Sequence, residues 1–188
     1  MSPVRFIIQV LAAAASFAMI AAAPARAGMI GSTVTSQYYV FGATYGSTAT
    51  FTADGQAHPS SYPLFNITVT DTQVIYQFTS AGSWTTSPTS LDSNGLYISN
   101  GNLLSFTGPA ILSAKIDPAT TMAGFTASNL TFNGGAIAVS WGGLAFNSST
   151  KVVLDVATVD EPRASALLAL GVGGFALSRR PWRRRKLG

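Results

Sequence analysis

The strongest constraint on the fold is a two-residue alternation of apolar and polar side chains on both sides of one short turn. Residues 65–70 read Phe-Asn-Ile-Thr-Val-Thr, and the alternation resumes from Val74 to Phe78 after Asp71-Thr72. Successive side chains of a β-strand point to opposite faces, so a period of two places the apolar set on one face. Two such runs joined by a tight turn predict an antiparallel β-hairpin that packs one face on a core.

A second hairpin is predicted between residues 130–132 and 137–141, which are joined by Asn133-Gly134-Gly135. Glycine accepts the positive φ that tight hairpin turns require, and we expect it here. No stretch repeats at helical spacing over three turns. The pattern predicts an all-β domain, an antiparallel β-sandwich or jelly roll, over residues 28–158. Further strands are expected at 38–41, 48–52, 96–99, 103–106, 111–116 and 152–156.

Charge is concentrated at the two ends of the chain. The whole chain carries a formal charge of +4, but residues 28–158 hold two lysines and five aspartates, a net charge of −3. A nucleic-acid-binding domain needs a basic face to neutralise phosphates, so we exclude nucleic acid as a partner. The chain has no cysteine, which excludes disulfides, thiolate metal sites and a cysteine nucleophile.

The first 27 residues have the layout of a secretory signal peptide. Arg5 supplies the positive start, residues 6–23 are almost wholly apolar, and Ala25 and Ala27 flank Arg26 in a small-residue cleavage site. We therefore predict a signal helix cleaved between Ala27 and Gly28. The alternative is an uncleaved anchor, because the apolar stretch is nearly long enough to span a bilayer.

The C-terminal segment combines a short apolar stretch with a cluster of arginines. Residues 164–177 carry no charge, and a helix of that length covers about 21 Å, less than the roughly 30 Å hydrocarbon core. The following basic residues would stay cytoplasmic by the positive-inside rule. We expect a short transmembrane helix that holds the folded domain outside the inner membrane. The topology-setting residues are Arg179, Arg180, Arg183, Arg184 and Arg185.

The order Val159-Asp160-Glu161-Pro162, a Gly- and Leu-rich apolar segment and an arginine cluster resembles the PEP-CTERM sorting signal of Gram-negative bacteria. The resemblance covers about thirty residues at the end of the chain, residues 159–188. Glu161 and Pro162 match the second and third letters of the signal, whereas Asp160 replaces its first proline. The resemblance implies a precursor held transiently in the inner membrane. An exosortase-like enzyme would then remove the tail and release the protein to the cell surface or into extracellular polysaccharide. The alternative is a plain C-terminal membrane anchor.

Candidate catalytic groups are few. The single histidine, His58, shares one Gly- and Pro-containing loop with Asp54 and Ser60. Triads are assembled from separated elements that fix their geometry, so we expect an exposed loop histidine rather than a Ser-His-Asp site. A glycoside hydrolase would need two carboxylates within about 10 Å of each other in a cleft, and the five aspartates are dispersed at turns and on one strand.

No cofactor or metal site is predicted. Asp92-Ser93-Asn94-Gly95 resembles the start of a calcium loop, but Ile98 stands where the bidentate glutamate is required. We expect a turn there.

Aromatic residues offer one candidate binding feature. Trp84 lies in the Gly- and Ser-rich stretch 81–90 and is the candidate for stacking on a sugar ring, whereas Trp141 ends a strand and is expected in the core. The sequence thus predicts an exported, non-enzymatic surface or matrix protein that acts in adhesion or exopolysaccharide structure. A carbohydrate-binding module, a plain inner-membrane protein and a hydrolase remain as alternatives.

Overall fold

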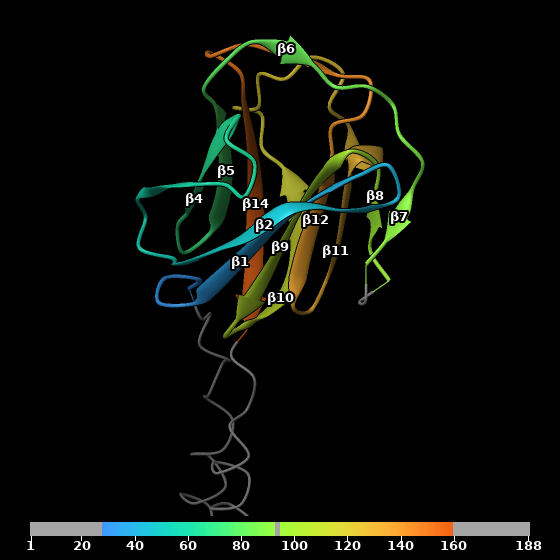
Figure 1. Cartoon of the computed structure of the whole chain (residues 1–188). Coiled ribbons are helices and arrows are strands. Elements are labelled where there is room, and N and C mark those ends of the chain that lie inside the picture. The colour runs from blue at the N-terminus through green and yellow to red at the C-terminus, as the bar shows by residue number, and fades with distance from the viewer. Residues whose placement is uncertain (1–27, 93–94, 160–188) are drawn as a thin grey trace, which may run out of the picture.

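The computed structural model describes residues 28–92 and 95–159 (Figure 1). The predicted signal peptide (residues 1–27) and the predicted sorting tail from Asp160 onward lie outside these residues. Within the described part of the chain, no helix has the length and apolar character needed to cross a membrane.

Two five-stranded antiparallel sheets form the domain, and the all-β antiparallel prediction is confirmed. One sheet has the order β11-β12-β9-β1-β2 and the other the order β10-β14-β5-β4-β3. The first comprises β11 (Leu130–Asn133), β12 (Ala136–Ser140), β9 (Gly101–Thr107), β1 (Thr33–Val40) and β2 (Ala43–Thr52). The second comprises β10 (Ala110–Ile116), β14 (Lys151–Val159), β5 (Gln73–Phe78), β4 (Phe65–Val69) and β3 (Ala57–Pro59). The remaining elements are β6 (Gly82–Ser83), β7 (Ser90–Leu91), β8 (Tyr97–Ile98), β13 (Ala145–Phe146) and a 3-10 turn, η1 (Ala127–Asn129).

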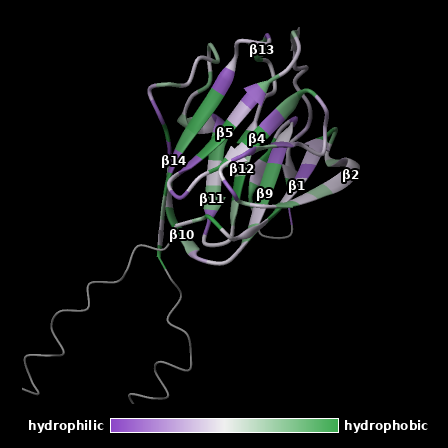
Figure 2. Cartoon of the chain, turned by 90° about the vertical axis from the view of Figure 1, so that its left-hand side faces the viewer, coloured by the Kyte–Doolittle hydropathy of each residue, from purple (hydrophilic) through white to green (hydrophobic). Residues whose placement is uncertain are grey.

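The two sheets share one hydrophobic core, so the architecture is sandwich-like. Apolar residues of β4, β5 and β14 meet those of β1, β9 and β12 between the sheets. In Figure 2, β14 and β9 carry the green of hydrophobic residues along parts of their length. The predicted alternation is confirmed, because every apolar side chain at its inward positions in β4 and β5 is at most 1% exposed. Trp141 is fully buried and meets the rings of Tyr76 and Phe78 edge-on. Burying a large apolar side chain contributes about 1.5–3 kcal/mol, so this aromatic centre is a main source of stability.

Both predicted hairpins are present, but their turns differ from expectation in one respect. At Asp71-Thr72, the Thr70 amide donates to the Gln73 carbonyl at 2.9 Å, and the Gln73 amide donates to Thr70 Oγ1 at 3.0 Å. The β11–β12 turn pairs Asn133 with Ala136, yet neither intervening glycine is among the described residues with positive φ. The prediction of a glycine with positive φ was therefore wrong at this turn. The Asn133 side chain stabilises it instead, since its Oδ1 accepts from the Gly135 amide at 2.9 Å.

A small flap, β7–β8, covers the outer face of the first sheet. Leu96 and Ile98 form a second buried cluster with Leu103 of β9 and with two alanines of β12. All five residues of β12 are consequently buried. This strand therefore packs on both faces.

The described ends of the chain lie at the same end of the domain. Ala110 and Val159 are paired where β10 meets β14, and Thr107 and Thr33 are paired where β9 meets β1, on either side of the short β9–β10 connection. Figure 1 shows both ends at the bottom of the domain and β6 at the opposite end. Gly28 and Val159, the first and last described residues, therefore lie at one end of the domain.

Candidate functional site

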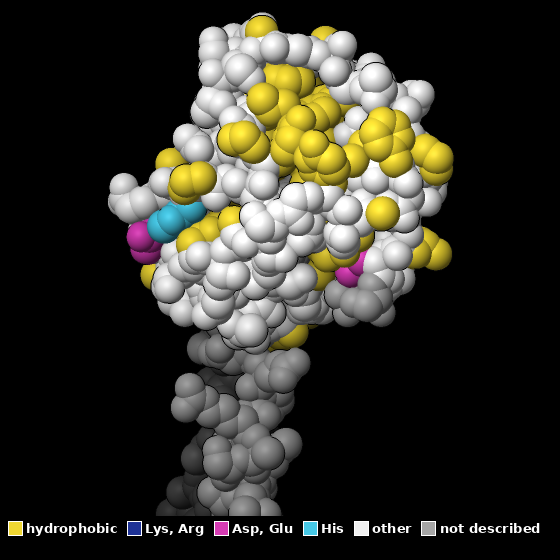
Figure 3. Space-filling view, viewed as in Figure 1, with side chains coloured by type: hydrophobic (Ala, Val, Ile, Leu, Met, Phe, Trp, Pro, Cys, Tyr) yellow, Lys and Arg dark blue, Asp and Glu magenta, His cyan; other side chains and the backbone are white. Residues whose placement is uncertain are grey.

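The main candidate site is a pocket of about 330 Å³ in the half of the domain away from the chain ends. Its walls come from residues 38–45 of the β1–β2 hairpin, from 62–64, from 81–85, and from Asn100 and Phe146. Figure 3 shows hydrophobic side chains gathered on this part of the surface, beneath β6 and above β2. The volume lies at the lower end of the range of about 300–1,000 Å³ that is typical of small-ligand sites.

A continuous cluster of aromatic rings forms the pocket walls. Tyr38 stacks on Tyr62 with ring centroids 4.7 Å apart, and Trp84 stacks on Phe146 at 5.1 Å. Tyr45 meets Tyr62 edge-on at 5.6 Å. These offset and edge arrangements are the geometries that aromatic quadrupoles favour, so the cluster fixes the shape of the pocket.

Trp84, the predicted sugar-stacking residue, is a wall of this pocket rather than an exposed platform. Its side chain is only 8% exposed, and its indole Nε1 is buried without a hydrogen-bond partner. A buried donor without a partner costs about 1–3 kcal/mol. The exposed rings of the site belong to the β1–β2 hairpin, where Tyr45 is 50% and Phe41 is 71% exposed.

Asn100 supplies a buried polar group at the base of the pocket. Its Oδ1 accepts a hydrogen bond from the Tyr38 hydroxyl, and its Nδ2 donates to the Thr85 carbonyl at 2.7 Å. Burial, with a smaller contribution from Tyr62, raises the pKa of the Tyr38 phenol, so the hydroxyl remains protonated and continues to donate. The network joins β1 to the 81–85 segment and leaves no ionised group at the base.

The backbone is strained at the rim of the pocket. Phe41 and Gly42 form the two-residue turn between β1 and β2, with φ values of 55° and 80°. Such a turn favours asparagine and glycine, and left-handed φ costs other residues about 1–2 kcal/mol. Asn100, with φ of 48°, is the only other non-glycine residue of the described chain with positive φ. Both residues line the same pocket.

Gly82 allows the backbone of β6 to pack closely against the Phe146 ring in the pocket wall. At Gly82, in the short β6–β13 pairing, an added Cβ would lie 3.0 Å from Cζ of Phe146. The absence of a side chain therefore lets β6 lie against the Phe146 ring and close that side of the pocket.

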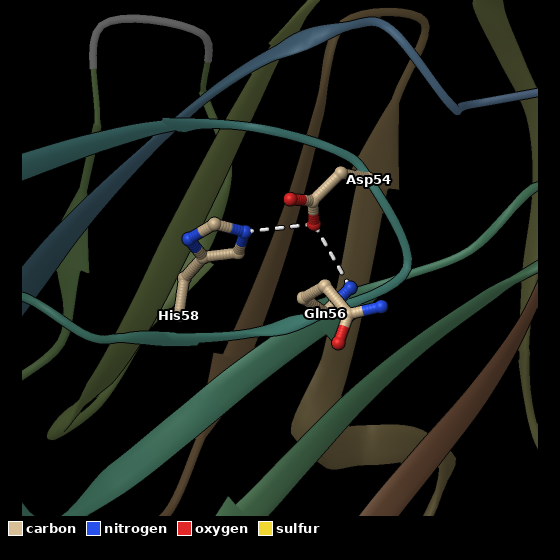
Figure 4. A network of polar contacts seen from close by, with 3 residues as sticks. All are labelled: Asp54, Gln56 and His58. Atoms are coloured by element: carbon tan, nitrogen blue, oxygen red, sulfur yellow. Dashed lines mark hydrogen bonds and ion pairs between the residues drawn. The ribbon is translucent and has the colours of Figure 1, made fainter.

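His58 is paired with Asp54 but is not part of a triad. Its Nε2 lies 2.9 Å from Asp54 Oδ1, which also accepts from the Gln56 amide at 2.8 Å (Figure 4). Hydrogen bonds from His58 and then from Gln56 hold the pKa of Asp54 below its ordinary value. The histidine ring stacks on Phe51 at 4.4 Å, and Ser60 bonds to Tyr62 instead of to the histidine. The histidine lies on β3, half-buried, which corrects the expectation of an exposed loop position.

Two of the predicted turn and strand aspartates are neighbours. The Gln73 side-chain amide donates to Asp155 Oδ1 at 2.9 Å and to Asp117 Oδ2 at 3.3 Å, so the carboxylates are closer than the limit of about 10 Å for a hydrolytic pair. Asp155 points outward from β14, and neither carboxylate lines the aromatic pocket. Asp155 is exposed on β14, and Asp117 is half-buried directly after β10.

Asp92 closes a turn, as expected. Its carbonyl accepts from the Gly95 amide at 3.0 Å, and its Oδ1 accepts from the Leu96 amide at 2.8 Å. Within residues 28–92 and 95–159, no group of three or more His, Asp or Glu side chains is placed to hold a metal ion.

Of the residues predicted to direct processing, only Gly28 lies within the described part of the chain. Ala25 and Ala27, the sorting residues Asp160, Glu161 and Pro162, and the arginine cluster lie outside it. Gly28 lies inside it, against Asp71, whose Oδ1 would be 1.9 Å from a Cβ at that position. The side chain of Asp71 thus occupies the space that a larger residue 28 would need.

Comparisons with known proteins returned no match, whether to protein-family models, to curated proteins or to solved structures.

Proposed function

We propose that this chain is an exported, non-enzymatic protein of the cell surface or extracellular matrix that acts in adhesion or exopolysaccharide structure. Its sandwich-like ectodomain would be flanked by a signal helix and by a short transmembrane helix that holds the precursor in the inner membrane. An exosortase-like enzyme would recognise Asp160-Glu161-Pro162 and release the domain.

The observation that carries this proposal is the order of features after Val159: an acidic-proline sequence, a short apolar segment and an arginine cluster. The fold is compatible with it, because Gly28 and Val159 lie at the same end of the domain (Figure 1). A membrane-held precursor would then keep its aromatic pocket away from the membrane.

Intact mass of the protein recovered from the surface and medium of its Gram-negative host tests the proposal. Loss of residues 1–27 and of the segment after about Pro162 is the expected result. A mass that retains 164–188 would instead mean a plain membrane anchor and would refute exosortase processing. A variant with Glu161→Ala serves as the matched control, since it should retain the tail while the untouched signal peptide is still removed.

The pocket favours the carbohydrate-binding version of this function over a purely structural one. A domain that acted only as matrix filler would have no need of an open aromatic cavity with strained backbone at its rim. Strained residues that persist in a fold cluster at binding and catalytic sites. The ectodomain would then link the released protein to polysaccharide.

A further inference from the structure

We propose that the aromatic pocket binds an uncharged segment of a polysaccharide, with the exposed ring of Phe41 as its principal contact residue. This inference rests on the proposed function and adds the ligand class and the residue that recognises it.

The charge of the site selects against ionic ligands. None of the described residues that line the pocket is acidic or basic. The polar side-chain atoms of the lining are neutral: the hydroxyls of the tyrosines and of Ser83 and Thr85, the buried Nε1 of Trp84, and the Asn100 amide at the base, which is already bonded to Tyr38 and Thr85. An uronate, phosphate or sulfate would lose hydration there without gaining a counter-charge. A neutral ligand bears no such penalty.

The walls suit the mixed surface of a sugar ring. Aromatic faces carry negative charge density, and the C–H bonds on one side of a sugar present weakly positive hydrogens to them. Tyr45 and Phe41 expose their rings at one rim, and Ser83 and Thr85 place hydroxyls at another. A saccharide segment can therefore lie with an apolar side against the rings and its hydroxyls toward the serine and threonine.

Phe41 is the residue that folding alone does not explain. Its ring is 71% exposed, so it adds little to the core, and its backbone is left-handed in a turn that asparagine would form more readily. The fold tolerates a residue that is unfavourable for the turn and exposed to water. A contact made by the ring with a partner outside the chain accounts for both features, since backbone strain of this kind is retained at ligand sites.

The pocket is also placed where a long polymer can reach it. It lies in the half of the domain opposite Gly28 and Val159, and Figure 3 shows it open on the surface beneath β6. A ligand chain can thus reach the pocket from the side of the domain away from Gly28 and Val159.

The experiment compares two substitutions by affinity electrophoresis in native gels that contain a neutral glucan, a neutral mannan or a polyuronate. The full chain is purified in a detergent without a sugar headgroup. Phe41→Asn replaces the exposed ring with the residue that the turn favours. Leu112→Asn is the matched control, because Leu112 is 62% exposed on β10 and outside the pocket. Urea unfolding of each variant reports on the fold.

We expect at least one neutral polysaccharide to retard the unchanged protein, with affinity about tenfold weaker for Phe41→Asn and unchanged for Leu112→Asn. The unfolding midpoint of Phe41→Asn should be equal to or above that of the unchanged protein. Equal retardation of both variants would overturn the pocket assignment while leaving the proposed export and polysaccharide association intact. Retardation that depends on Phe41 only in the polyuronate gel would overturn the neutral ligand class. Absence of retardation in both neutral gels would overturn this inference, whereas the mass measurement would still decide export and processing.

Discussion

Substitution of Gly101 by alanine should be among the most destabilising single-methyl changes in the domain. Gly101 begins β9 and is paired with Tyr39 of β1 on one side and with Ser140 of β12 on the other. An added Cβ would lie 1.9 Å from the carbonyl oxygen of Val139 and 3.0 Å from the Cα of Ser140. Both obstacles are backbone atoms of a strand that is buried on both faces, so a side-chain rotation cannot relieve the clash.

The expected loss in free energy of unfolding follows from the backbone atoms that the new methyl group must displace. The Val139 oxygen has to retreat by about 1 Å, and overpacking of this kind costs about 1–3 kcal/mol. Displacing β12 also weakens one or two hydrogen bonds of the β9–β12 ladder, each worth about 1 kcal/mol. We therefore expect Gly101→Ala to lower the free energy of unfolding by about 2–5 kcal/mol.

Urea unfolding of the full chain, followed by far-ultraviolet circular dichroism, measures this loss. Gly134→Ala is the matched control, because an added Cβ there meets no atom within 4 Å and the residue is outside the left-handed region. That variant should gain about 0.4–1 kcal/mol from the stiffer unfolded chain. If Gly101→Ala loses less than about 0.5 kcal/mol, or if the two variants shift alike, the tight β9–β12 approach is wrong.

Three further predictions concern the core, the base of the pocket and acid stability. Trp141→Ala should lower the free energy of unfolding by about 3–5 kcal/mol in urea titrations, and a loss below 1 kcal/mol would contradict its place at the centre of the core. Tyr38→Phe should cost about 1–3 kcal/mol in the same assay, because it leaves the buried Oδ1 of Asn100 without its donor; an unchanged midpoint would show that the bond contributes nothing. The pKa of Asp54 is lowered in the folded state by the hydrogen bond from His58, so this contribution is present above the ordinary carboxyl pKa and is lost as pH falls through the folded value. Unfolding measured from about pH 5 to about pH 2 should therefore show less acid sensitivity for Asp54→Asn than for the unchanged chain, and parallel curves would refute the linkage.

Among the strands with one buried face, the sequence predicted β4 and β5 along their length but only 38–41 of β1, which begins at Thr33. In β4 and β5, apolar residues at every second position gave a signal of the correct period, and the tertiary structure buries that face. The β2 strand was only half predicted, as 48–52 instead of 43–52. Its first six residues are all exposed, so no hydrophobic alternation marks them. An edge strand held mainly by backbone pairing with β1 leaves little trace in side-chain pattern.

The pocket was not predictable as a set, although Trp84 was identified. Its walls come from segments far apart in sequence, and Tyr62, Asn100 and Phe146 reach the site only because loops converge at one end of the sandwich. One local signal was available. Phe41-Gly42 stands between two strands where asparagine-glycine is the usual turn sequence, and an aromatic residue there conflicts with the local preference.

The exposure of each pocket aromatic residue decides whether its substitution can separate an effect on ligand affinity from an effect on stability. Tyr38, Trp84 and Phe146 are each at most 8% exposed and pack on one another, so shortening any of them would weaken the wall and the core together. A loss of binding in such variants would not distinguish contact from collapse. Phe41 is the most exposed of the pocket aromatics, and its turn favours asparagine over phenylalanine. Phe41→Asn should therefore relieve the backbone strain and remove the ligand contact at the same time. Opposite changes in stability and affinity at one position are therefore what a binding role predicts, whereas a purely structural role predicts that both fall.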